Sequence, residues 1–147
     1  MSTYVPRSLR RFVEKRANGV CEYCLAHQDD TYAGGTIEHI VSRKHKGATH
    51  SSNLAWSCLV CNGFKGSDIA TVYGGELTRL FNPRKDHWGD HFKLHGSRIL
   101  GLSDIGRATV ELLRFNAPER ILERDALRSL GKFPPRTIMR LLKRSRP

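Results

Sequence analysis

The chain has 147 residues, a length that fits one domain with a modest core. Its hydrophobic fraction of 39% is too high for wholesale disorder, and no window approaches the roughly 18 uninterrupted apolar residues of a membrane span. Lysine and arginine total 25 against 14 aspartates and glutamates, so the net charge of +11 favours a polyanion such as nucleic acid as partner over a merely solvated basic surface.

The N-terminal segment predicts a short basic helix. Residues 1–16 are basic and polar and lack the apolar run of a signal peptide, so we expect a cytoplasmic protein with no membrane contact. Residues 8–18 place apolar side chains at helical spacing, and Asn18-Gly19 supplies a stop signal.

The next segment predicts strand, loop, strand and helix in that order. Residues 36–40 alternate and are rich in β-branched side chains, which is typical of a strand. Residues 41–52 form a basic loop, and residues 53–57 return as a second short strand. We expect a helix to start near Asn62.

The C-terminal half predicts a hairpin followed by helices. Gly74-Gly75 marks a break, and two short strands are expected around residues 95–97. Ser103 is a good N-cap for a helix to about residue 116, where Asn116 could cap a second helix over 118–130. A last basic helical stretch is expected at residues 137–143.

Aromatic and histidine residues precede this hairpin. Trp88 and Phe92 are expected in the core because aromatic side chains bury large areas. His87, His91 and Arg84 could line a nucleic-acid groove or support a site. Since no linker requires a second domain, we expect a single domain over 1–147, with a motif core at 20–68 and a C-terminal extension at 76–147.

The cysteines form two matched pairs with C-x2-C spacing, Cys21/Cys24 and Cys58/Cys61. In a reducing compartment this pattern indicates a metal site rather than disulfides. Four thiolates around Zn²⁺ form a closed tetrahedral site with no open position for substrate, so we expect structural zinc. Four cysteines also hold iron–sulfur clusters, which stay as an alternative.

The segment between the cysteine pairs carries a recognisable combination of residues. Ile-Glu-His-Ile-Val stands at 37–41, Asn53-Leu54 follows, and Cys58-Leu-Val-Cys-Asn-Gly-Phe-Lys-Gly ends at residue 66. An acid-His pair, an Asn-Leu pair and a cysteine pair followed by Asn and Lys together resemble the HNH endonuclease family over residues 8–68. The C-terminal half resembles, less closely, the tails of small bacterial HNH proteins, notably cyanobacterial ones.

The resemblance implies an α+β fold. Its centre would be a ββα-metal core with a four-cysteine zinc knuckle, with an N-terminal helix before it and a mostly helical C-terminal extension after it. It also implies that Glu38 and Asn62 bind the catalytic ion and that Asn53 orients the catalytic histidine. Many members have histidine at the position of Asn62; two oxygen ligands favour Mg²⁺ or Mn²⁺ here.

The chemistry of phosphodiester hydrolysis points to His39. The reaction needs a water deprotonated near neutral pH, and histidine has an unperturbed pKa of about 6.5. His39 is therefore the predicted general base, with His45 and His50 in the loop as rivals. On a strand, Glu38 and His39 point to opposite faces. Contacts to phosphates are expected from four cations around the site: Arg43, Lys44, Lys46 and Lys65.

These patterns predict a divalent-metal-dependent endonuclease that hydrolyses DNA phosphodiester bonds with a histidine base, and the expected partner is double-stranded DNA. The alternative is a zinc-ribbon-like module that binds nucleic acid without catalysis, since charge and cysteines alone would suit it equally. A structural module within a larger assembly is a third possibility, which no feature of the sequence favours.

Overall fold

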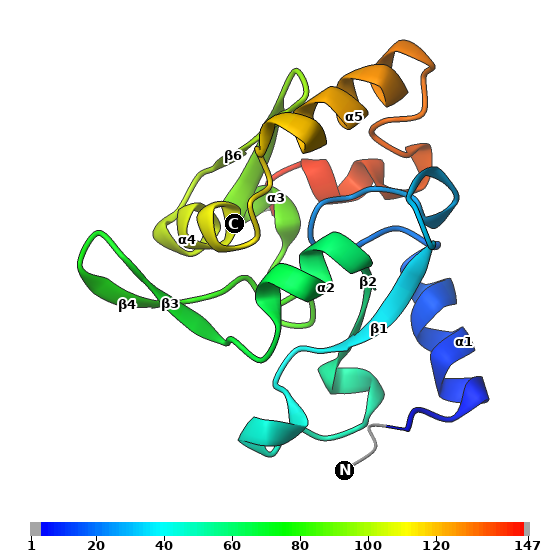
Figure 1. Cartoon of the computed structure of the whole chain (residues 1–147), viewed down its shortest axis with the longest axis vertical. Helices are drawn as coiled ribbons and strands as arrows, with labels where there is room; N and C mark the ends of the chain where they lie inside the picture. Colours follow the sequence, from blue (N-terminus) through cyan, green and yellow to red (C-terminus); the bar gives the residue numbers. More distant parts are fainter. Residues whose placement is uncertain (1–3, 146–147) are drawn as a thin grey trace.

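The motif region folds as two antiparallel strands followed by a helix, as the sequence predicted. The computed structural model describes residues 4–145, and the outermost residues of the predicted domain lie outside this range. Strands β1 (Gly35–His39) and β2 (Leu54–Cys58) form an antiparallel pair. Helix α2 (Leu59–Lys65) follows β2 directly, and Figure 1 shows it beside the two strands.

Helix α2 begins at Leu59, earlier than the start near Asn62 that the sequence predicted. The reason is that Cys58 caps the helix, because its sulfur accepts a hydrogen bond from the Cys61 amide. The cap places Cys58 and Cys61 on one tight turn.

Helix α1 (Arg7–Arg16) packs on the other face of the β1–β2 hairpin, close to its predicted span. Its Val13 is fully buried beside Leu54 and Trp56 of β2. Because strand residues alternate between faces, Ile37 lies towards α1 whereas Glu38 lies towards α2. The strand that ends in His39 is therefore held between two helices.

A second hairpin, which the sequence did not predict, follows α2. Strands β3 (Ala70–Tyr73) and β4 (Glu76–Arg79) pair around Gly74 and Gly75, and both glycines have positive φ. Such a two-glycine turn matches the twist of the flanking strands. The break predicted at this position is the turn of a hairpin that packs on a later helix, α4.

The C-terminal half contains the predicted third hairpin and helices. Its elements are α3 (Trp88–His91), β5 (Phe92–His95), β6 (Arg98–Gly101), α4 (Asp104–Leu112), α5 (Pro118–Ser129) and a 3-10 segment (Arg136–Leu142). Ser103 caps α4 as predicted, since its hydroxyl accepts from the Gly106 amide. Helix α4 ends earlier than predicted, and Asn116 binds both backbone groups of Ile99 instead of capping α5.

One continuous core joins the motif region to the C-terminal half. Trp88 and Phe92 lie in it, as predicted, and Phe81 and Phe115 pack against Phe92. The indole of Trp88 donates to the Tyr23 carbonyl at 2.9 Å, so the core also carries a polar link between the halves. The α+β prediction is confirmed. Within residues 4–145, every helix is too short or too polar to cross a membrane.

Candidate functional site

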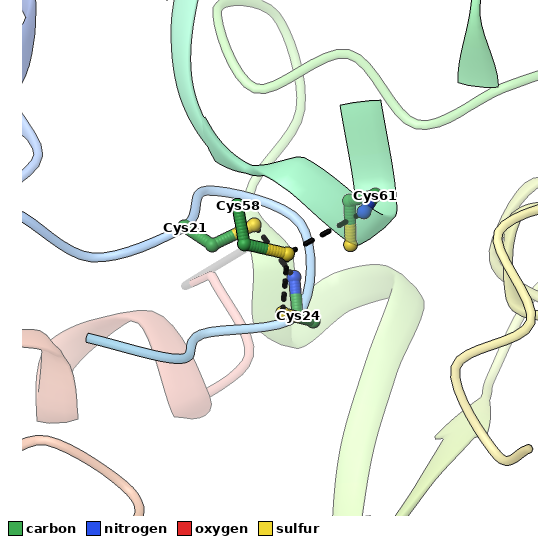
Figure 2. Close-up of side chains that lie close together, drawn as sticks. All are labelled: Cys21, Cys24, Cys58 and Cys61. Carbon is green, nitrogen blue, oxygen red and sulfur yellow. Dashed lines mark hydrogen bonds between the residues drawn. The ribbon is translucent and has the colours of Figure 1, made fainter. Parts of the chain in front are cut away.

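The four cysteines gather in one buried cluster. All their sulfurs lie within 4.8 Å of one another, and Figure 2 shows them converging from two turns of the chain. The Sγ atoms of Cys24 and Cys58 are 3.7 Å apart, far beyond the roughly 2.05 Å of a disulfide. Zn–S bonds of about 2.3 Å place tetrahedral sulfurs about 3.8 Å apart. The cluster therefore fits a four-coordinate ion, and four close cysteines can bind zinc.

Backbone hydrogen bonds shape both turns. The Cys24 amide donates to the Cys21 sulfur at 3.5 Å, and the Cys61 amide donates to the Cys58 sulfur at 3.4 Å. Leu25 closes the first turn with a positive φ of 69°. Backbone contacts thus hold the two sulfurs of each C-x2-C segment on one turn.

A buried arginine from helix α5 contacts this cluster, and no local pattern of residues predicts that contact. Arg120 is 7% exposed, and its Nη2 lies 3.2 Å from the Cys61 sulfur and 3.9 Å from that of Cys58. Burial tends to lower the pKa of Arg120, but the charges of Cys24 and Cys61 outweigh burial and raise it. Its Nη1 binds the carbonyls of Leu113 and Arg114. Arg120 therefore links the extension to the sulfurs.

His39 lies at the end of β1 and is partly exposed. Its Nε2 shares a hydrogen bond of 3.0 Å with the Thr49 hydroxyl in the following loop. Burial lowers the pKa of His39, and the nearby charge of Arg43 lowers it further. The imidazole is therefore neutral, and able to accept a proton, at neutral pH.

Asn53 holds the loop that follows His39. Its side chain accepts from the Val41 amide and donates to the carbonyls of Val41 and Ala48, each at 2.9 Å. Among the described residues the amide contacts backbone and not the imidazole, for which Thr49 is the partner. Gly47 packs so closely that an added Cβ would lie 1.7 Å from the Val41 oxygen. Asn53 and Gly47 thus set the path of the loop.

Glu38 is engaged by two neighbours within the protein. The side chain is 2% exposed; its Oε2 accepts from the Tyr23 hydroxyl at 2.5 Å, and its Oε1 lies 2.6 Å from Lys65 Nζ. Lys65 also donates to the Ile40 carbonyl at 2.8 Å. Burial raises the pKa of Glu38, and Lys65 opposes that effect only in part.

Lys65 was predicted to contact a phosphate, but in the structure its side chain is buried. It is 1% exposed and points inward to Glu38, so its ammonium does not face solvent where a phosphate would lie. The sequence could not separate these cases, because a lysine one turn past Asn62 can face either way. The other predicted contacts, Arg43, Lys44 and Lys46, are all exposed.

Asn62 lies in α2, which packs on β1, and its side chain is partly exposed. Within residues 4–145, the four cysteines form the one group of three or more His, Cys, Asp or Glu side chains close enough to hold an ion. The carboxylate of Glu38 already has Tyr23 and Lys65 as partners. An ion bound at Glu38 would therefore have to displace the Lys65 ammonium from Oε1, and Asn62 as a second ligand stays a prediction.

The polar residues before the third hairpin make contacts within the fold. His87 binds the Lys143 carbonyl, and His91 binds the Ser103 hydroxyl at 2.6 Å. Arg84 pairs with Glu22, whose other oxygen accepts from the Trp56 amide. These contacts connect elements of the fold. His39, in contrast, lies in strand β1 of the motif.

Comparison with known proteins identifies the motif region. Residues 21–68 match the HNH endonuclease family. The resemblance predicted from the acid-His, Asn-Leu and cysteine patterns is thereby confirmed for this segment, which holds every predicted site residue. No solved structure matches the chain.

A relative extends the similarity beyond the HNH segment. The Septu protein PtuB of Bacillus thuringiensis is 26% identical over 108 residues, covering 72% of this chain. The aligned part is 40% of PtuB, so the chain spans less than half of the length of that relative. The similarity indicates distant relatedness.

Arg120 should support metal retention by the cysteine cluster. Arg120→Gln removes the charge beside Cys61, and we expect zinc affinity to fall by about 10–100-fold, as for other partners of metal ligands. Arg120→Lys should restore part of it. Competition with a chromophoric chelator measures the affinity. The exposed Arg128→Gln on the same helix should behave as wild type; equal zinc release from Arg120→Gln and wild type would contradict this role.

Glu38 and Lys65 should be energetically coupled. Lys65→Met leaves a buried carboxylate without its cation, which typically costs about 3–5 kcal/mol. The double variant Glu38→Gln/Lys65→Met should lose less than the sum of the single losses. Urea unfolding measures the free energy of unfolding of each variant. Strictly additive losses would show that the ion pair is not a stabilising contact.

Gly47 should be irreplaceable in the loop after His39. Gly47→Ala drives a Cβ into the Val41 carbonyl, so we expect a loss on the order of 1–3 kcal/mol in stability. Gly63→Ala in α2 is the matched control, since its added Cβ would meet no atom within 4 Å apart from the adjacent residues and the backbone of its own helix, and alanine favours a helix by about 1 kcal/mol. Denaturation midpoints should move in opposite directions; a shared direction would refute the packing argument.

Proposed function

We propose that this protein is a divalent-metal-dependent endonuclease that hydrolyses phosphodiester bonds of double-stranded DNA, with His39 as general base. The observation that carries the proposal is the HNH match over residues 21–68 together with a partly exposed His39 whose pKa is lowered. A neutral imidazole at the edge of the molecule is suited to take a proton from an attacking water.

The loop would prepare the base. If Nε2–H donates its hydrogen bond to the Thr49 hydroxyl oxygen, then Nδ1 keeps its lone pair and can take the proton of the water. Asn53 would act as a positioning residue, because it fixes the loop that carries Thr49. Arg43, Lys44 and Lys46 would hold the phosphate backbone beside His39.

Two metal sites belong to the proposal. Structural zinc in the cysteine cluster would join β2 and α2 to the turn that carries Cys21 and Cys24. Free thiolates of this kind require a reducing compartment, and we propose the cytoplasm. Mg²⁺ or Mn²⁺ would stabilise charge on the phosphate when bound. Glu38 and Asn62 are its proposed ligands, and binding at Glu38 would require Lys65 to leave Oε1.

The contact of Glu38 with Lys65 favours a second candidate function. If that ion pair persists with nucleic acid bound, the motif lacks a carboxylate for the ion. The chain would then be a module that binds nucleic acid through its basic surface without cutting it.

Cleavage of supercoiled plasmid tests the proposal. Purified zinc-loaded protein should cut when Mg²⁺ or Mn²⁺ is added to metal-free buffer. His39→Ala should reduce the rate by about 10²–10⁴-fold and leave plasmid affinity unchanged, because the imidazole acts in proton transfer. His45→Ala, in the exposed loop, is the control and should still cut. A folded, zinc-loaded protein that binds plasmid and never cuts would favour the binding module.

A further inference from the structure

Helix α1 displays a row of cations that the proposed site does not use. Arg7, Arg11 and Lys15 recur every four residues and are exposed, and Glu14 is the one acidic residue of the helix. Within residues 4–145 none of the three takes part in an ion pair. At 1.5 Å per residue the row spans about 12 Å along one side of the helix.

The register of the strands brings helix α1, which carries this row on its outer side, to the face of the hairpin that carries His39. His39 lies opposite Leu54, and directly opposite residues of an antiparallel pair share one face. Leu54 packs on Val13 of α1, so His39 belongs to the α1 face. Helix α1 also contacts the turn at Ser51–Asn53, and Figure 1 shows its first turn at the same end of the molecule as that loop.

A second group of unpaired cations lies in the loop after His39. Residues 39–67 contain no aspartate or glutamate, and Arg43, Lys44 and Lys46 are exposed. Several arginines elsewhere have carboxylate partners instead: Arg79 with Asp86, Arg84 with Glu22, Arg107 with Asp104 and Arg128 with Asp125. Positive charge without a carboxylate partner therefore lies on two elements: the loop that follows His39, and helix α1, which packs on the face of the hairpin that carries His39.

The start of α1 is electrostatically unfavourable on its own. Its first turn holds no acid, Pro6 offers no side-chain cap, and Arg7 stands at the positive end of the helix dipole. Neighbouring cations are held in place: the Arg10 guanidinium lies 5.5 Å from the Trp56 ring centroid, and Arg16 donates to the Leu54 carbonyl. A polyanion bound along the row would offset the repulsion among Arg7, Arg11 and Lys15.

We propose that Arg7, Arg11 and Lys15 form a second contact for the phosphate backbone of double-stranded DNA, in addition to the loop cations that follow His39. This inference rests on the proposed function. Because α1 packs rigidly on the hairpin that ends in His39, backbone contacts along the helix would set the position of the duplex relative to the base.

Binding measured without catalytic metal tests this contact apart from cleavage. The double variant Arg7→Gln/Arg11→Gln should weaken affinity for a fluorescent 20-base-pair duplex about tenfold. The slope of log K against log salt concentration should also become less negative by about two, because each lost phosphate contact changes that slope by about 0.9. The control Lys93→Gln/Arg98→Gln removes equal charge from exposed positions of the β5–β6 hairpin and should keep the wild-type slope. The thermal midpoint of the α1 variant should hold or rise.

The outcomes separate this inference from the proposed function. Equal binding by the α1 variant and the control, in a protein whose wild type binds and cuts plasmid, would overturn the α1 contact and leave the nuclease intact. A wild type that neither binds nor cuts duplex would refute both. Binding of phosphatidylserine vesicles in preference to duplex, lost in the α1 variant, would make the row a membrane contact and overturn the proposal.

Discussion

The contact between Arg120 and the cysteine sulfurs joins parts of the chain that are far apart in sequence. The sulfurs come from the turn after α1 and from the junction of β2 and α2, and Arg120 reaches them from α5. Thiolates around a divalent ion keep a net negative charge, which is costly to bury alone. Arg120 offsets that charge and binds two carbonyls at the end of α4, so the HNH segment and the extension stabilise each other.

Side chains alternate between the two faces of strand β1, so that Glu38 and His39 lie in different surroundings. Glu38 faces α2, where Tyr23 and Lys65 engage both its oxygens, whereas His39 belongs to the opposite face and stays partly exposed. A buried pair fixes β1 against α2, and α1 fixes it from the other side. The imidazole is therefore placed by two packed helices and a short loop rather than by long-range contacts of its own.

The loop after His39 combines rigid backbone with free charge. The side chain of Asn53 and the close packing of Gly47 fix the backbone of the loop. Its arginine and lysines lie on the surface without carboxylate partners. The same division holds for α1, whose apolar side packs on β2 while its cations face outward. Packing on one side and unpaired charge on the other are what a surface for a polyanion requires.

Local patterns in the sequence determined the cysteine pairs, the strand with the acid-His pair, the first helix, the cap at Ser103 and the resemblance to the HNH family. Each depends on residues a few positions apart, where spacing and propensity suffice. The tertiary structure alone decided that Lys65 faces Glu38, that Arg120 contacts the sulfurs, and that Asn116 binds Ile99 instead of capping α5. A long polar side chain can serve solvent, a charge or a backbone group, and only the packing of distant segments selects its partner.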